Sequence, residues 1–277
     1  MQAIFDKTGA GLLLFLFLLQ LPFSANANPD SELDQIAKLI FKNECASKDS
    51  CLTSWNKGEE FASLGIGHFI WYPATGHKTF QESFPALITF MMQQGKQPPA
   101  WLANRPKQSN PWISREAFLG DYNSQKMHEL RDFLIQNKTS QAEFMQQRLR
   151  TTLPKILERL DQSTKKHVRQ QFELVAASPM GMYVLMDYVN FKGEGTNLNE
   201  RYHGKGWGML QVLEKMNCDR PGLLAVKSFA DSADSLLTQR VKLSPAARNE
   251  IRWLAGWRIR LNTYIHESKQ LFNQSQL

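Results

Sequence analysis

Apolar residues recur at intervals of three and four along most of the chain, which predicts a largely helical protein. In the first such segment, Leu33, Ile36 and Ile40 share one face of a helix that is expected to begin at Ser31 and end near Glu44. Further helices are expected over residues 85–94, over most of 114–177 with breaks near 137 and 154, over 179–191, over 204–216, and in two segments of 223–272 that separate at 244–245.

One short stretch, residues 61–72, departs from the helical spacing. It is rich in aromatic residues and is followed by a proline, which is typical of a strand or a β-hairpin. Alternation along a strand places Ile66 and His68 on one face and Gly65 and Gly67 on the other. Two glycines leave bare backbone, as expected where a ligand or another main chain comes close. With the helices, this stretch predicts an α+β fold that is mostly α.

The first 27 residues have the features of a secretory signal. Lys7 precedes an apolar run from Leu12 to Phe23, and Ala25-Asn26-Ala27 is a small-x-small cleavage site. The run is about a dozen residues, shorter than the roughly 20 that a membrane-spanning helix needs, although an uncleaved anchor is the alternative. We therefore expect a mature chain that begins near Asn28 and is periplasmic or secreted.

Composition and charge narrow the choice of partner. The chain has 277 residues, of which 42% are hydrophobic and 21% charged, which is ordinary for a globular protein. Its formal net charge of +7 favours an anionic partner. Export argues against nucleic acid, so an acidic polymer of the cell envelope is the better candidate, with peripheral association with the membrane or envelope as a further possibility. We expect a monomer.

Three cysteines are present, Cys45, Cys51 and Cys218. In an oxidising compartment Cys45 and Cys51 could close a small loop next to Glu44, although either could also pair with Cys218. No Cys-x-x-Cys or Cys/His cluster occurs, so we expect no metal site and no cofactor.

Glu44 is the first candidate for chemistry. It extends the apolar stripe of the first helix, so its carboxyl group is expected to be partly desolvated. Desolvation disfavours the charged form and lets a carboxylic acid hold a proton near neutral pH, as a general acid must.

Three blocks of sequence resemble a known family. Glu44 followed by Ser63-Leu64-Gly65-Ile66-Gly67-His68 is similar to the phage-type lysozymes of the lysozyme-like superfamily, whose catalytic Glu ends a helix before a Thr-Ile-Gly-Ile-Gly-His strand. Residues 188–195, with the sequence Tyr-Val-Asn-Phe-Lys-Gly-Glu-Gly, resemble the Phe-Asn-x-Gly-x-Gly segment of that family's large lobe. Residues 254–260 resemble the arginine-rich helix near its C-terminus. The blocks occur in the family's order.

The resemblance implies a lysozyme-like domain over residues 28–277. It implies a small lobe with a β-hairpin over roughly 45–80 and a larger helical lobe over roughly 81–277. The implied activity is cleavage of the glycosidic bonds of peptidoglycan glycan strands, with Glu44 as the general acid. Ser63 would take the family's catalytic Thr position, and the implied substrate-binding residues are Gly65, Gly67, His68, Asn190 and Glu194.

The chain departs from the family at the second carboxylate. The family has an Asp nine residues after the Glu and six before the Thr, where this chain has Thr53 and Lys57 respectively, because its loop is four residues longer. Glu59 and Glu60 are the nearest acids, and we expect the longer loop to carry one of them inward.

Two rival functions follow from this departure. A lytic transglycosylase would use Glu44 alone, because the sugar's own hydroxyl group attacks. A catalytically silent envelope protein would keep the fold in order to bind glycan or a protein partner.

Overall fold

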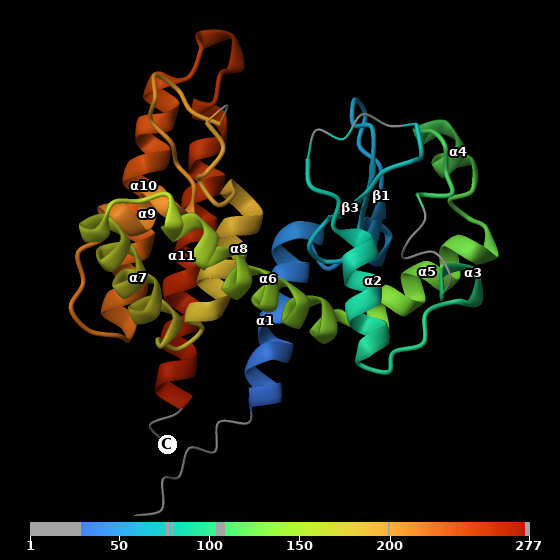
Figure 1. Ribbon diagram of the computed structural model, residues 1–277, viewed down its shortest axis with the longest axis horizontal. Coiled ribbons are helices and arrows are strands. Elements are labelled where there is room, and N and C mark those ends of the chain that lie inside the picture. The colour runs from blue at the N-terminus through green and yellow to red at the C-terminus, as the bar shows by residue number, and fades with distance from the viewer. Residues whose placement is uncertain (1–28, 76–77, 79, 104–108, 199, 275–277) are drawn as a thin grey trace, which may run out of the picture.

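The computed structural model describes residues 29–75, 78, 80–103, 109–198 and 200–274, which form two lobes bridged by one long helix (Figure 1). The bridge is α6 (Lys138–Glu158), and α1 (Pro29–Cys45) lies beside it between the lobes. The fold is mostly helical with one small antiparallel sheet, so the predicted α+β, mostly α class is confirmed. A continuous set of buried apolar side chains extends through both lobes.

The first lobe contains the sheet, whose three strands are paired in chain order, β1-β2-β3. Ser63 of β2 pairs with Ser54 of β1 on one side and with Ile70 of β3 on the other. The sheet and the segments around it run as follows: η1 (Asp49–Leu52), β1 (Thr53–Ser54), β2 (Ala62–Leu64), β3 (Phe69–Trp71), α2 (Phe84–Gln93), α3 (Ala100–Ala103), α4 (Arg115–Gly120) and α5 (Gln125–Gln136).

The second lobe is helical. It contains α7 (Gln162–Ala176), α8 (Gly181–Lys192), α9 (Met209–Lys215), α10 (Leu223–Leu243), η2 (Ala246–Arg248) and α11 (Ile251–Gln274). Every residue of α8 from Gly181 to Tyr188 is buried, which makes α8 the central helix of the lobe. The lack of a side chain at Gly181 allows the start of α8 to pack closely on the end of α7, because a Cβ at this position would lie 1.7 Å from the carbonyl oxygen of Val175.

The predicted elements are present, with several differences at their ends. Residues 61–72 form a hairpin whose turn spans 65–68, so alternation holds only as far as Leu64. The first helix begins at Pro29 instead of Ser31, and α9 begins at Met209, several residues after the predicted position 204. The break expected at Pro154 is absent, and α6 continues to Glu158. Pro154 cannot donate a backbone hydrogen bond to the carbonyl oxygen four residues earlier, but α6 continues for about one more turn beyond it.

The boundary between the two lobes also lies later in the chain than expected. In Figure 1, helices α2 to α5 lie with the sheet, so the first lobe extends to about residue 136 instead of ending near residue 80. Over the described residues, no helix has the length and apolar character needed to cross a bilayer. The predicted signal over residues 1–27 and the start near Asn28 lie outside the described residues and remain predictions.

Candidate functional site

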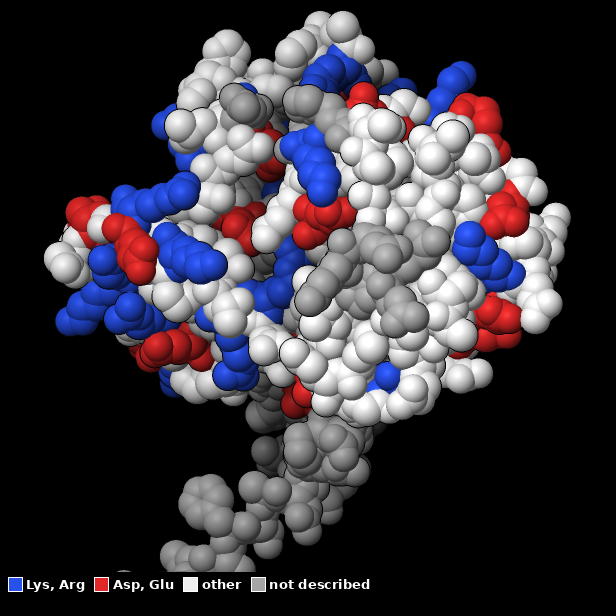
Figure 2. All heavy atoms as spheres, turned by 45° about the vertical axis from the view of Figure 1, so that its right-hand side comes forward, with Lys and Arg blue, Asp and Glu red and all other residues white. Residues whose placement is uncertain are grey.

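A cleft of about 400 Å³ is lined by both lobes. The face of the molecule drawn in Figure 2 has a hollow with acidic and basic side chains inside it. Five of the predicted site residues line the cleft, namely Glu44, Gly67, His68, Asn190 and Glu194. The structure therefore brings together residues from the first two of the three sequence blocks.

Glu44 lies in the last turn of α1, with a side chain that is 14% exposed. Its Oε1 accepts a hydrogen bond from the guanidinium group of Arg260, and its Oε2 lies 3.8 Å from Nδ1 of His68. Arg260 belongs to the third block, so the first and third blocks meet at this carboxyl group, while the second block lines the same cleft.

Arg260 is held by a carboxylate that the sequence analysis did not identify. Asp187 of α8 is fully buried, and its two oxygens accept hydrogen bonds of 2.7 and 2.8 Å from Arg260. The hydroxyl group of Tyr264 and the amide of Asn43 donate to the same carboxylate at 2.6 and 3.1 Å. Burial tends to lower the pKa of Arg260, but the hydrogen bonds and charge of Asp187 and the charge of Glu44 raise it above its ordinary value. Asp187 and Arg260 thus form a charged pair that orients Glu44.

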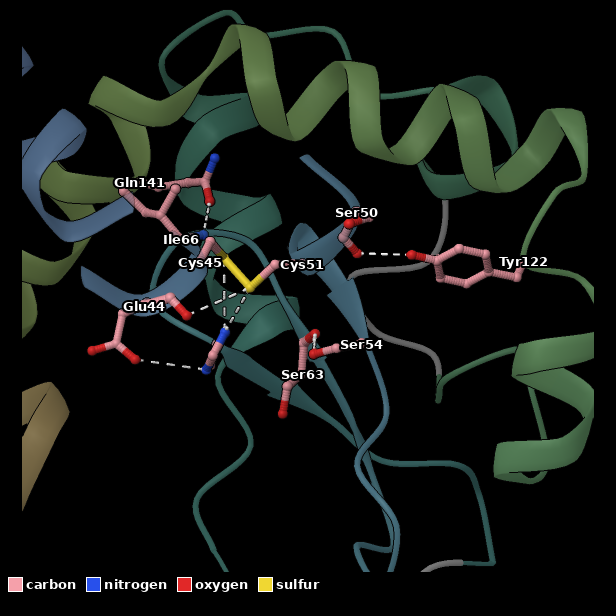
Figure 3. The surroundings of a disulfide bond; sticks show 10 residues. Glu44, Cys45, Ser50, Cys51, Ser54, Ser63, Ile66, Tyr122 and Gln141 are labelled. Carbon is pink, nitrogen blue, oxygen red and sulfur yellow. Dashed lines mark hydrogen bonds and ion pairs between the residues drawn. A yellow bond between two sulfur atoms is a disulfide. The ribbon is translucent and has the colours of Figure 1, made fainter. Parts of the chain in front are cut away.

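His68 lies close to both Glu44 and a disulfide bond. Figure 3 shows that disulfide bond, between Cys45 and Cys51, beside Glu44. His68 adopts a left-handed conformation at φ 49° in the hairpin turn, and its Nε2 lies 3.5 Å from Sγ of Cys51. Cys45 and Cys51 form the disulfide, so this pairing is confirmed, and Cys218 is a free thiol. The disulfide closes the loop that follows Glu44 and joins the end of α1 to η1.

The sulfur atoms of Cys45 and Cys51 and the ring of His68 are the one group of described residues with the spacing of metal ligands. The two sulfur atoms are bonded to each other, and it is the thiolate that serves as a metal ligand. In its oxidised form, this group does not fit a metal ion.

The glycines of the hairpin turn have different environments. Gly65 has φ 72°, and a Cβ there would lie 2.3 Å from Oε1 of Gln141. Gln141 is fully buried on α6, and its Oε1 accepts a 2.9 Å hydrogen bond from the backbone N–H of Ile66. Gly65 therefore serves the attachment of the hairpin to α6 and does not line the cleft, whereas Gly67 does.

The helical lobe contributes Asn190, in the last turn of α8, and Glu194, just beyond the end of α8, to the lining of the cleft. The carbonyl oxygens of Gly193 and Glu194 accept hydrogen bonds of 3.0 Å from the N–H groups of Met209 and Leu210, the first two residues of α9. These bonds fix the loop that carries Glu194. Burial raises the pKa of Glu194 above its ordinary value, although the charge of Arg148 partly opposes this.

Arg148 of α6 lines the same cleft. Burial lowers the pKa of its guanidinium group, and the charge of Glu194 partly offsets that shift. Within the described parts of the chain, the guanidinium group makes no hydrogen bond or ion pair, and its carbon atom lies 5.8 Å from the ring centre of Phe144. It is available to a ligand with a negative charge.

The remaining predicted residues do not line this cleft. Ser63 is 4% exposed within β2. Glu59 and Glu60 border a separate depression beside Trp55 and Arg115, so the longer loop does not carry either acid to Glu44. This placement corrects the expectation that one of them supplies the second carboxylate of the cleft.

The two positions at which the family has its Asp also lie elsewhere. Thr53 is buried, and its hydroxyl group accepts a 2.7 Å hydrogen bond from Arg131. Lys57 borders the same depression as Glu59.

The cleft contains a carboxyl group at the end of α1, a second carboxyl group from the helical lobe, two side-chain amides, an imidazole and a guanidinium group. Such a lining suits a ligand rich in hydroxyl and amide groups with some negative charge, and the Glu44 carboxyl group is placed to exchange a proton with it. Comparisons of the chain with known protein families, with characterised proteins and with solved structures found no match in any of the three.

Proposed function

We propose that this protein is a secreted glycoside hydrolase with a lysozyme-like fold, which cleaves the glycan strands of peptidoglycan. Glu44 is the general acid that protonates the leaving glycosidic oxygen. The observation that carries the proposal is the convergence of three distant blocks of sequence on one cleft between the lobes. The first and second blocks line the cleft, and Arg260 of the third block binds Glu44.

Asp187 and Arg260 are positioning residues in this proposal. They lock one oxygen of Glu44 through Arg260 and leave the other oxygen on the side of His68. A positioned acid can contribute about 10²–10⁴-fold to the rate. As bond cleavage begins, the leaving oxygen becomes more basic and takes the proton, and the carboxylate that remains is stabilised by Arg260.

Glu194 is the second carboxylate in the proposed mechanism, in place of Glu59 or Glu60. Among the residues that line the cleft, Glu44 and Glu194 are the two acids. An inverting glycosidase requires a carboxylate that holds a water molecule on the far face of the sugar ring. The charge of Arg148 helps to keep Glu194 ionised for this role, against the burial that disfavours it.

The alternative is a lytic transglycosylase that uses Glu44 alone. The absence of Glu59 and Glu60 from the lining of the cleft favours it, because the nearest acids in sequence are then not available to activate water. The reaction product separates the two: a hydrolase produces reducing ends, whereas a transglycosylase produces anhydro ends.

The test uses purified peptidoglycan as the substrate and mass spectrometry of the products. Glu44→Gln should still fold, because the amide oxygen can accept the hydrogen bond from Arg260, and should lose about 10²–10⁴-fold in rate. Glu59→Gln is the matched control, because it makes the same change outside the cleft, and it should retain full activity. Cleavage by Glu44→Gln at the wild-type rate would rule out the assignment. A wild-type protein that binds peptidoglycan without cleaving it would instead indicate a silent envelope protein.

A further inference from the structure

A row of stacked cationic and aromatic side chains leads away from Glu44 along the helical lobe. The guanidinium carbon of Arg260 lies 4.4 Å from the ring centre of Phe191. The ammonium group of Lys192 lies 4.0 Å from that ring centre and 3.7 Å from the ring centre of Trp257. Trp257 in turn packs against Trp253, with ring centres 6.2 Å apart and an angle of 37° between the planes.

The row follows one face of α11. Trp253, Trp257 and Arg260 stand at positions i, i+4 and i+7, which share a face of a helix. Arg260 contacts Glu44, so the same face continues from the acid toward the beginning of α11. Seven residues correspond to a rise of about 10 Å, which places Trp253 well beyond the immediate surroundings of Glu44.

Exposure changes along this row. Trp257 is 9% exposed and belongs to the core, whereas Trp253 is 38% exposed. The guanidinium carbon of Arg252, an exposed residue, lies 4.7 Å from the ring centre of Trp253. The row therefore begins in the buried charged pair beneath Glu44 and ends in an indole ring with solvent-accessible surface and a positive charge at its border.

Two tryptophans of the first lobe, Trp101 and Trp112, have environments that differ from that of Trp253. Trp112 is 4% exposed and packs edge-on against Trp101 and Phe118 in the first lobe. Its ring nitrogen donates a 2.8 Å hydrogen bond to Asp121. Trp112 thus belongs to the hydrophobic core, and Trp101 packs against that core.

We infer that Trp253, bordered by Arg252, is a distal subsite for the glycan strand whose cleavage is proposed at Glu44. The inference rests on that proposed function and extends it along α11. The C–H face of a sugar ring packs on the exposed part of the indole, and the positive charge of Arg252 complements a carboxylate substituent of an acidic glycan. Strands long enough to reach from Glu44 to Trp253 gain this contact, and shorter strands do not.

The experiment measures binding of peptidoglycan glycan strands of defined length to the Glu44→Gln protein, in which cleavage is blocked. Trp253→Ala in that background should weaken binding of long strands about two- to tenfold, the usual range for one aromatic contact, and so lower the ratio of long-strand to short-strand affinity. Trp253→Phe, which keeps an aromatic face, should restore most of the ratio.

Phe272→Ala is the matched control. Phe272 is also on α11 and has the same exposed fraction of 38%, but it lies 19 residues further along the helix, so its loss should leave both affinities unchanged. Equal weakening of short and long strands by Trp253→Ala, or no effect on either, would overturn the subsite while leaving the proposed function intact. Failure of the wild-type protein to bind or cleave any strand would count against the proposed function itself.

Discussion

The charged pair beneath Glu44 should be a large contributor to stability. Asp187 is fully buried, and Arg260, whose side chain is 15% exposed, loses both of its hydrogen bonds to this carboxylate in Asp187→Ala. Removal of one member of a buried pair costs about 3–5 kcal/mol, because the other charge stays buried with fewer partners. In this variant Arg260 keeps its contact with Glu44, and the buried hydroxyl group of Tyr264 also loses its acceptor. For a chain of this size, a cost of about 3–5 kcal/mol corresponds to a fall in melting temperature of about 6–20 °C.

A matched control is present on the same helix. Arg258 of α11 donates to Asp234 at 2.7 and 3.3 Å, but the two side chains are 49% and 38% exposed. Asp234→Ala should cost about 0–1 kcal/mol, because water replaces the lost partner. Equilibrium denaturation in urea measures both changes in the free energy of unfolding.

A third variant separates charge burial from loss of packing. Asp187→Leu combined with Arg260→Met removes both charges, so it should recover part of the stability that Asp187→Ala loses. The double variant should nevertheless remain impaired in cleavage, because Glu44 no longer has its positioning residue. Equal costs for Asp187→Ala and Asp234→Ala would refute the argument that burial makes this pair strong.

Three further predictions follow from the site. Burial raises the pKa of Glu194 above its ordinary value of 4.5. The protonated side chain therefore stabilises the fold below about pH 4.5, and this contribution is lost as the pH rises and the group ionises. The melting temperature of Glu194→Gln, measured relative to wild type, should therefore increase between about pH 4 and pH 7. Alkylation and intact-mass analysis should find one free thiol, Cys218, and Cys45→Ser should cost about 2 kcal/mol because the disulfide closes a short loop with a sequence separation of 6. Gly65→Ala should destabilise the protein more than Gly58→Ala in thermal melts, because both have positive φ but only the Cβ at position 65 meets a neighbour, Gln141, at 2.3 Å.

Local sequence patterns predicted the elements of the fold better than their grouping. The apolar periodicity predicted α2 and the division between α10 and α11, because those signals come from neighbouring residues. The hairpin turn at Gly65 requires a positive φ, which simple alternation does not represent. The assignment of α2 to α5 to the first lobe depends on packing between distant segments, and a single sequence with no contact information does not specify it.

The candidate site likewise contains residues that local sequence patterns predict and residues that they do not. Glu44 could be predicted because its helix end, the glycine hairpin and their order lie within a short stretch of chain. The Asp187–Arg260 pair joins residues 73 positions apart, and Arg260 reaches Glu44 across 216 positions, so no local pattern contains it. One signal was nevertheless present in the sequence. Asp187 is the one charged residue between Gly181 and Val189, a stretch that is otherwise apolar, and a buried carboxylate requires a cationic partner. The arginine-rich third block was the natural place to look for that partner, and the same reasoning leads from Arg260 along α11 to Trp253.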